Sequence, residues 1–232
     1  MTHYKQALLF FLLVVAGLAC QSPREPAAES TESAASSDTV ATAQDAEKVI
    51  LFFGNSLTAG YGLEPSEAFP ALIQQKLDSS GYDYRTVNAG LSGETTASGL
   101  SRLDWVLERQ PVDVFVLELG ANDGLRGIEP TETQQNLAAL IEKARAANPD
   151  VTIVLAGMLV PPNMGPEYAD RFQRIFPEVA QAKNVTLIPF LLEGVAGDPE
   201  LNQADGIHPT VEGQQIVARN VWETIKPLLE AA

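Results

Sequence analysis

Short apolar runs alternate with longer amphipathic segments from about residue 47 to the end of the chain. Apolar runs of roughly four to eight residues predict buried strands. The predicted strands are Val49–Phe53, Arg85–Asn88, Val112–Leu119, Thr152–Gly157 and Val185–Pro189, of which only Arg85–Asn88 is mostly polar. The third is almost unbroken apart from Asp113 and Glu118, which is typical of a strand covered on both faces.

The segments between these runs have apolar residues at helical spacing. They are Ser66–Ser79, Thr95–Glu108, Pro130–Asn148, Tyr168–Lys183 and a final helix that begins near Thr210. Strands that alternate with helices of this length predict right-handed crossovers and a parallel sheet between two layers of helices. Such sheets bind ligands outside the carboxyl ends of their strands, so the chemistry is expected in the loops that follow them.

Polar or glycine-rich loops follow four of the predicted strands. The first three are Gly54–Gly60, Asn88–Gly93 and Gly120–Gly124, and the loop after the fifth strand ends in Asp205–His208. Because the carboxyl ends of parallel strands meet at one edge of a sheet, we expect these four loops to converge.

Three residues in these loops suggest a reaction class. We expect Ser56 to lie in a small, flexible turn at a strand end, where its hydroxyl is presented and not packed away. Asp205 and His208 supply a carboxylate and an imidazole three residues apart. These are the components of a nucleophilic hydrolase, because a serine hydroxyl becomes a strong nucleophile when an imidazole accepts its proton. Each residue alone also fits an ordinary turn or helix cap, and the combination favours catalysis.

Composition narrows the alternatives. The chain has two histidines, of which His3 lies in a segment that we expect to be removed, and one cysteine, so a metal site is disfavoured. Acidic residues outnumber basic ones by 30 to 15, for a net charge of −15, which disfavours a nucleic-acid partner. Gly54–Gly60 lacks the Gly-Lys-Ser/Thr ending of a P-loop. We therefore expect no metal, cofactor or nucleic acid.

Residues 1–20 have the features of an export signal. A weakly basic start at Lys5 precedes the uncharged run Ala7–Leu18, which is shorter than the roughly 20 apolar residues of a membrane span. Cys20 directly follows Ala19, as in the bacterial lipoprotein box, in which the cysteine is acylated and becomes the new N-terminus. Ordinary cleavage after Ala19, or an unmodified cysteine, is the alternative.

Residues 21–46 contain Ser, Thr, Ala, Glu and Pro but no aromatic residue, a composition that predicts a disordered linker. A random coil of this length reaches on the order of 30 Å. An Asp directly after the lipidated cysteine is the usual signal that keeps a lipoprotein in the inner membrane. Gln21 stands at that position here, which favours the outer membrane. We expect an exported protein that is anchored through a lipidated Cys20 and lies in the periplasm or at the cell surface. The linker is expected to lead to one folded domain at residues 47–232.

Four motifs occur together and in one order. They are Gly54-Asn55-Ser56-Leu57, the Gly90 loop, Gly120-Ala121-Asn122-Asp123 and Asp205-Gly206-Ile207-His208-Pro209. This set resembles the sequence blocks of the SGNH (GDSL-type) hydrolases, over about Lys48–Leu229. Within that superfamily, Ser56–Tyr61 and Asn122–Gly127 resemble the bacterial multifunctional acyl-CoA thioesterase, arylesterase and lysophospholipase group. The resemblance implies a three-layer α/β/α, flavodoxin-like fold with a parallel five-stranded sheet.

The resemblance also implies roles for individual residues. Ser56 would be the nucleophile, His208 its general base and then acid, and Asp205 the residue that orients His208. The backbone N–H groups of Ser56 and Gly90 and the side-chain amide of Asn122 would form the oxyanion hole. The family's usual Asp before the serine is Asn55 here, which affects the hydrogen bonding of the loop and its pH dependence rather than the reaction class.

The expected substrates are carboxylic esters or thioesters of short to medium acyl chains. Leu125–Glu129 and Met158–Gly165 lie in loops at the same edge and would flank the acyl chain, unless their apolar residues belong to the core or to turns. One alternative function is a carbohydrate O-acetylesterase, although no aromatic platform for a sugar is visible. Another is a surface lipoprotein that binds an acyl ligand without turnover. The oligomeric state is open, with a monomer as the expectation.

Overall fold

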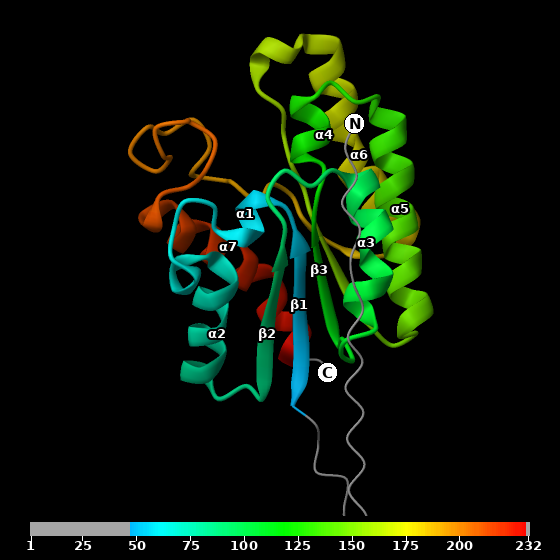
Figure 1. Ribbon diagram of the computed structural model, residues 1–232, viewed down its shortest axis with the longest axis vertical. Coiled ribbons are helices and arrows are strands. Elements are labelled where there is room, and N and C mark those ends of the chain that lie inside the picture. The colour runs from blue at the N-terminus through cyan, green and yellow to red at the C-terminus, as the bar shows by residue number, and fades with distance from the viewer. Residues whose placement is uncertain (1–46, 231–232) are drawn as a thin grey trace, which may run out of the picture. The chain divides into compact units, whose positions relative to one another are not determined.

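The computed structural model describes residues 47–230, in which a parallel five-stranded sheet lies between two layers of helices (Figure 1). The strands are β1 (Lys48–Gly54), β2 (Tyr84–Gly90), β3 (Val114–Glu118), β4 (Thr152–Ala156) and β5 (Thr186–Ile188). Their order is β2-β1-β3-β4-β5, and every neighbouring pair is parallel. The predicted three-layer fold is confirmed, and the strand order reverses between β1 and β3, where such sheets bind ligands.

Helices cover both faces of the sheet, with α2 beside α7 on one face and α3, α5 and α6 on the other (Figure 1). The helices are α1 (Ser56–Ala59), α2 (Phe69–Ser80), α3 (Thr96–Leu107), α4 (Ala121–Leu125), α5 (Pro130–Ala147), α6 (Pro166–Lys183) and α7 (Val211–Glu230), with 3₁₀ turns η1 (Pro65–Glu67) and η2 (Pro162–Met164). The five predicted helices are confirmed. The short helices α1 and α4 lie where the sequence predicted only loops.

Strand β1 is buried inside the sheet. It pairs with β2 on one side and with β3 on the other, and Val49–Phe53 is at most 1% exposed. A strand buried on both faces has no polar face, which explains the continuous apolar run. Burial of each large apolar side chain contributes roughly 1.5–3 kcal/mol, so the strand that ends at the Ser56 turn is firmly held.

Helix α2 begins at Phe69 and not at Ser66, so the predicted start is wrong. Ala68 has extended backbone angles (φ −66°, ψ 144°) and separates η1 from the helix. Pro70 then falls in the first turn, where its missing N–H removes no helical hydrogen bond. The N–H of Phe69 donates to Gln214 Oε1 at 2.9 Å, which ties the start of α2 to α7.

The predicted export signal, Cys20 and the linker at residues 21–46 lie outside the described residues. Among residues 47–230, no helix combines the length and apolar character needed to cross a membrane.

Candidate active site

Ser56 is the first residue of α1. This short helix follows the carboxyl end of β1, with Asn55 between the two elements (Figure 1). Asn55 caps this helix, because its Oδ1 accepts the N–H of Leu57 at 2.9 Å. Gly60 ends the helix with φ 72°, and its N–H donates to the carbonyl of Ser56. The first N–H groups of a helix have no partner within the helix. The N–H of Ser56 makes no hydrogen bond within residues 47–230, so it is available to a ligand.

The three candidate residues Ser56, His208 and Asp205 are hydrogen-bonded in series. His208 Nε2 lies 2.9 Å from Ser56 Oγ, and His208 Nδ1 lies 2.7 Å from Asp205 Oδ2. Folding therefore brings together side chains that are 152 positions apart. A carboxylate at Nδ1 favours the tautomer with its proton on that nitrogen, so Nε2 accepts the hydroxyl proton of Ser56.

Asp205 is held in its orientation by its own loop. Its Oδ1 accepts the N–H groups of His208 at 3.0 Å and of Ile207 at 2.9 Å. These backbone hydrogen bonds, together with the one from the imidazole of His208, lower the pKa of Asp205 to about 2. The carboxylate is therefore ionised at neutral pH and can stabilise a positive charge on His208.

Two residues that sequence reasoning did not single out connect the Ser56 loop with the His208 loop. The ring of Tyr61 packs on the imidazole of His208, with 4.6 Å between ring centroids. Gln203 donates from Nε2 to the carbonyls of Tyr61 (2.7 Å) and Pro209 (3.0 Å). Tyr61 was visible only as part of a motif, and nothing in the sequence indicated the contact of Gln203 across 142 positions.

Gly90, a predicted oxyanion-hole residue, is the last residue of β2 and lies beside Gly54 in the sheet. A Cβ at position 90 would overlap the backbone nitrogen of Ala59, so only glycine allows α1 to approach this closely. Its N–H donates to Asn88 Oδ1 at 2.9 Å. An oxyanion would therefore have to displace Asn88 from this donor.

Asn122, the third predicted oxyanion-hole residue, lies in α4 after β3, at the same edge of the sheet. Its Nδ2 donates to the carbonyl of Glu94 at 3.0 Å. An amide nitrogen carries two hydrogens, so one remains for a ligand. This donor set is thus assembled at one edge but partly engaged within the protein.

A buried network fixes the loops that carry these donors. Asp123 is fully buried and accepts the N–H (2.9 Å) and hydroxyl (2.5 Å) of Thr96, which joins α4 to the start of α3. Glu94 is 3% exposed and pairs with Arg102 at 2.5 Å. Arg102 also donates to the carbonyl of Ala89 at 2.9 Å. In the sequence Asp123 looked like an ordinary turn residue, so this anchoring was missed.

Asn55 contacts a second carboxylate, Glu118, which is 1% exposed at the end of β3. Asn55 Nδ2 donates to Glu118 Oε1 at 2.7 Å, and Thr58 Oγ1 donates to Oε2 at 2.7 Å. Burial raises the pKa of Glu118 to about 7, although the hydrogen bonds from Thr58 and Asn55 oppose this rise. In the sequence Glu118 was only a polar interruption of an apolar strand.

Large apolar side chains are exposed mainly around this edge. Within residues 47–230 they are Tyr61, Leu91, Trp105, Leu125, Leu159 and Ile207. All except Trp105 lie in loops or in the short helix α4, at the carboxyl ends of the strands. These side chains therefore lie at the same edge of the sheet as Ser56 and His208.

The two segments predicted to flank an acyl chain lie side by side. A Cβ on Gly127, in the first segment, would lie 3.8 Å from Met164 Cε in the second. Leu159 is 42% exposed, whereas Met158 is 3% exposed and belongs to the core. Met158 is therefore a core residue and does not face a ligand.

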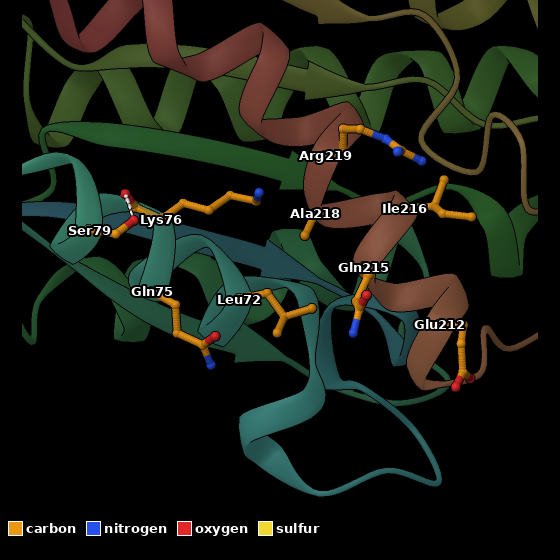
Figure 2. A pocket seen from close by; sticks show the side chains of 9 residues that line it. All are labelled: Leu72, Gln75, Lys76, Ser79, Glu212, Gln215, Ile216, Ala218 and Arg219. Atoms are coloured by element: carbon orange, nitrogen blue, oxygen red, sulfur yellow. Dashed lines mark hydrogen bonds between the residues drawn. The ribbon is translucent and has the colours of Figure 1, made fainter.

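A groove on the outer side of α2 and α7 is separate from this site (Figure 2). Leu72 and Lys76 of α2 line it, together with Glu212, Ile216 and Arg219 of α7. None of the four converging loops contributes to it. Within the described residues, no group of three or more His, Cys, Asp or Glu side chains is placed to hold a metal ion.

Comparison with known proteins agrees with the fold. Residues 52–216 match the model of the GDSL-like lipase/acylhydrolase family, which is more than half of the chain. The chain belongs to this family. Among its relatives is the esterase TesA of Pseudomonas aeruginosa, which is 47% identical over 188 residues, or 81% of this chain and 92% of the relative.

Other relatives carry several activities in their names. Thioesterase 1/protease 1/lysophospholipase L1 of Escherichia coli is 37% identical, over 79% of this chain and 86% of the relative. The crystal structure of esterase EstA from Pseudoalteromonas sp., inhibited by monoethylphosphonate, superposes with a TM-score of 0.74 at 37% identity. That superposition covers 79% of this chain and 99% of EstA.

Proposed function

We propose that this family member is a serine hydrolase that cleaves carboxylic esters or thioesters of short to medium acyl chains. The observation that carries the proposal is the hydrogen-bonded series from Ser56 Oγ through His208 to Asp205. Such a series makes a hydroxyl nucleophilic, because the imidazole accepts its proton and the carboxylate stabilises the resulting imidazolium.

The reaction begins when Ser56 Oγ attacks the carbonyl carbon of the substrate and its proton passes to His208 Nε2. The tetrahedral intermediate collapses when His208 returns this proton to the leaving alcohol or thiol, which leaves an acyl group on Ser56. Water then attacks the acyl-enzyme and gives a proton to His208, and the second tetrahedral intermediate collapses with cleavage of the bond to Ser56 Oγ, release of the carboxylic acid and return of the proton from His208 to Ser56. Asp205 stays ionised throughout, consistent with its low pKa of about 2.

The oxyanion of each tetrahedral intermediate requires donors. The N–H of Ser56 has no partner among the described residues, and Asn122 has a second amide hydrogen beyond the one given to Glu94. These two donors are available without rearrangement. The N–H of Gly90 becomes a third when Asn88 Oδ1 releases it, so the oxyanion takes over a hydrogen bond that already exists.

The apolar side chains around the site support an acyl substrate. Leu125 and Leu159 are 40% and 42% exposed, on the two adjacent segments after β3 and β4. Relatives named esterase, arylesterase and thioesterase 1/protease 1/lysophospholipase L1 support the same substrate class. Rates with p-nitrophenyl esters and acyl-CoA thioesters of increasing chain length should peak at short to medium chains. A strong preference for acetyl groups on carbohydrates would overturn this assignment.

The chemistry itself is tested with a fluorophosphonate probe, which reacts with activated serines. Wild-type protein should be labelled, and neither Ser56→Ala nor His208→Ala should be labelled at a comparable rate. Circular dichroism must show that all three proteins are folded. A folded wild-type protein that does not label at Ser56 would instead favour an acyl-binding protein without turnover.

We also propose that the enzyme is exported and anchored through an acylated Cys20. The support is the apolar segment before Ala19-Cys20 and the polar composition of residues 21–46. Radiolabelled palmitate should enter the wild-type chain during growth in a bacterial host, but not Cys20→Ala. Equal labelling of the two chains would exclude lipidation at this residue.

A further inference from the structure

We propose that Glu118 is a positioning residue, which fixes the turn that carries the nucleophile and acts through the amide of Asn55. The inference rests on the proposed function of Ser56 and extends it to a buried group that does not contact the substrate. Nothing in the reaction described above uses Glu118, yet it is a buried carboxyl group directly beneath the Ser56 turn.

Four donors converge on the two oxygens of Glu118. Oε1 accepts Asn55 Nδ2 at 2.7 Å. Oε2 accepts Thr58 Oγ1 at 2.7 Å, the N–H of Asn55 at 3.1 Å and the N–H of Thr58 at 3.3 Å. These donors come from residues on both sides of Ser56, so one side chain of β3 holds the whole turn. Gly54 leaves the space, since a Cβ there would come within 2.6 Å of Glu118 Oε2.

The contact with Glu118 also sets the direction of the Asn55 amide. Because Nδ2 points to the carboxylate, Oδ1 points the other way, where it accepts the N–H of Leu57 at 2.9 Å and lies 3.4 Å from Ser56 Oγ. A reversed amide would place two donors against each other at Leu57 and lose the cap of α1. The carboxylate thus selects one arrangement of the turn, in which Ser56 Oγ faces His208 at 2.9 Å.

An exchange of side chains tests this arrangement. In Glu118→Gln, the amide oxygen would accept the hydrogen bonds from Thr58 and from the N–H of Asn55. The new NH₂ group would face Asn55 Nδ2, so two hydrogen-bond donors would oppose each other. Adding Asn55→Asp supplies an acceptor at that point. The double variant Asn55→Asp/Glu118→Gln therefore satisfies every hydrogen bond that the single variant Glu118→Gln leaves in conflict.

The measurements are kcat and KM with a p-nitrophenyl ester, the rate of fluorophosphonate labelling, and the melting temperature, all made at alkaline pH, above the Glu118 pKa of about 7, so that the carboxyl group is ionised. Glu118→Gln should lower kcat and the labelling rate by about tenfold or more, as expected when a buried donor is left without an acceptor, with little change in KM. The double variant should recover most of this loss, and Asn55→Asp alone should not exceed the wild type.

A purely structural role for Glu118 predicts a different result. The melting temperature would fall in Glu118→Gln while kcat of the folded protein stayed at the wild-type value, and this outcome overturns the proposal. A double variant no more active than Glu118→Gln overturns it as well. Failure of the proposed function is separate, because it appears as a wild-type protein that the probe does not label.

A second pair of variants covers the case in which Glu118→Gln does not fold. Thr58→Val removes the hydroxyl donor to Glu118 Oε2, whereas Thr58→Ser keeps it. The proposal predicts a lower kcat and a lower labelling rate in Thr58→Val, and values near the wild type in Thr58→Ser. Equal kcat in the two variants would overturn it.

Discussion

The buried carboxyl group of Glu118 should make the stability of this protein depend on pH in a defined direction. Its pKa is about 7 in the folded chain, against an ordinary value of 4.5, so between these values the folded protein holds a proton that the unfolded chain has released. The free energy of unfolding therefore falls as the pH rises through this range. At about 1.36 kcal/mol per pH unit, the fall from this group amounts to about 3 kcal/mol.

Glu118→Gln should remove this dependence, because an amide does not titrate. The neighbours that contact the carboxylate are Asn55 and Thr58, neither of which changes charge in this range. The difference in unfolding free energy, wild type minus Glu118→Gln, should therefore decrease by about 3 kcal/mol between pH 4 and pH 8. The carboxyl group of Glu118 therefore adds most to the unfolding free energy of the wild type near pH 4.

Urea denaturation followed by circular dichroism measures this difference at intervals between pH 4 and pH 8. Groups that titrate equally in both proteins cancel in the subtraction. Glu193→Gln, which removes an exposed carboxylate instead, is the matched control for a change of one charge. Parallel profiles for wild type and Glu118→Gln would refute the reasoning, because the carboxyl group would then titrate alike in the folded and unfolded chains.

Three further changes test the site. Asp205→Asn should lower kcat by up to about 10⁴-fold. Folding lowers the pKa of Asp205 from 3.8 to about 2, so the stability that its carboxylate contributes should be constant above pH 5 and disappear as the pH falls from about 3.8 to about 2. Denaturation of the wild type and the variant at low pH measures this loss. Asn122→Ala should lower kcat about 10²–10³-fold with little change in KM, as steady-state kinetics would show. Gly90→Ala should displace α1, because its Cβ overlaps Ala59, and so lower both the melting temperature and Ser56 labelling.

The fold could be predicted from the sequence because its strands, helices and loops each have a characteristic pattern of apolar and polar residues. A strand between two neighbours, covered by helices on both faces, is apolar at almost every position, and this pattern identified Val49–Phe53 as a buried strand. The loops after such strands meet at one edge by geometry alone, which brought Ser56 and His208 into one prediction. The fold and the convergence of the loops needed no knowledge of individual contacts.

The sequence could not predict that two of the expected oxyanion-hole donors already make hydrogen bonds within the protein. Gly90 was expected to offer a free N–H, but the side chain of Asn88, two residues earlier, accepts it. The sequence gives both residues but not the rotamer that turns Asn88 back on its own loop. The same limit hid the hydrogen bond from Asn122 to the carbonyl of Glu94, which depends on how the loop after β2 lies against α4.

In the sequence, Asn55 replaces the family's usual Asp, and Glu118 is a polar residue in an apolar strand, with no evident relation between the two. The register of β1 and β3 brings them together. Gly54 pairs with Glu118, so the residue after the glycine lies above the carboxyl group. An aspartate at position 55 would set two buried carboxyl groups against each other, and one of them would have to hold a proton. The amide instead donates to Glu118 at 2.7 Å and still caps α1 with its oxygen. Asn55 is thus matched to the carboxylate beneath it, and this explains how the turn keeps Ser56 in place without the family's aspartate.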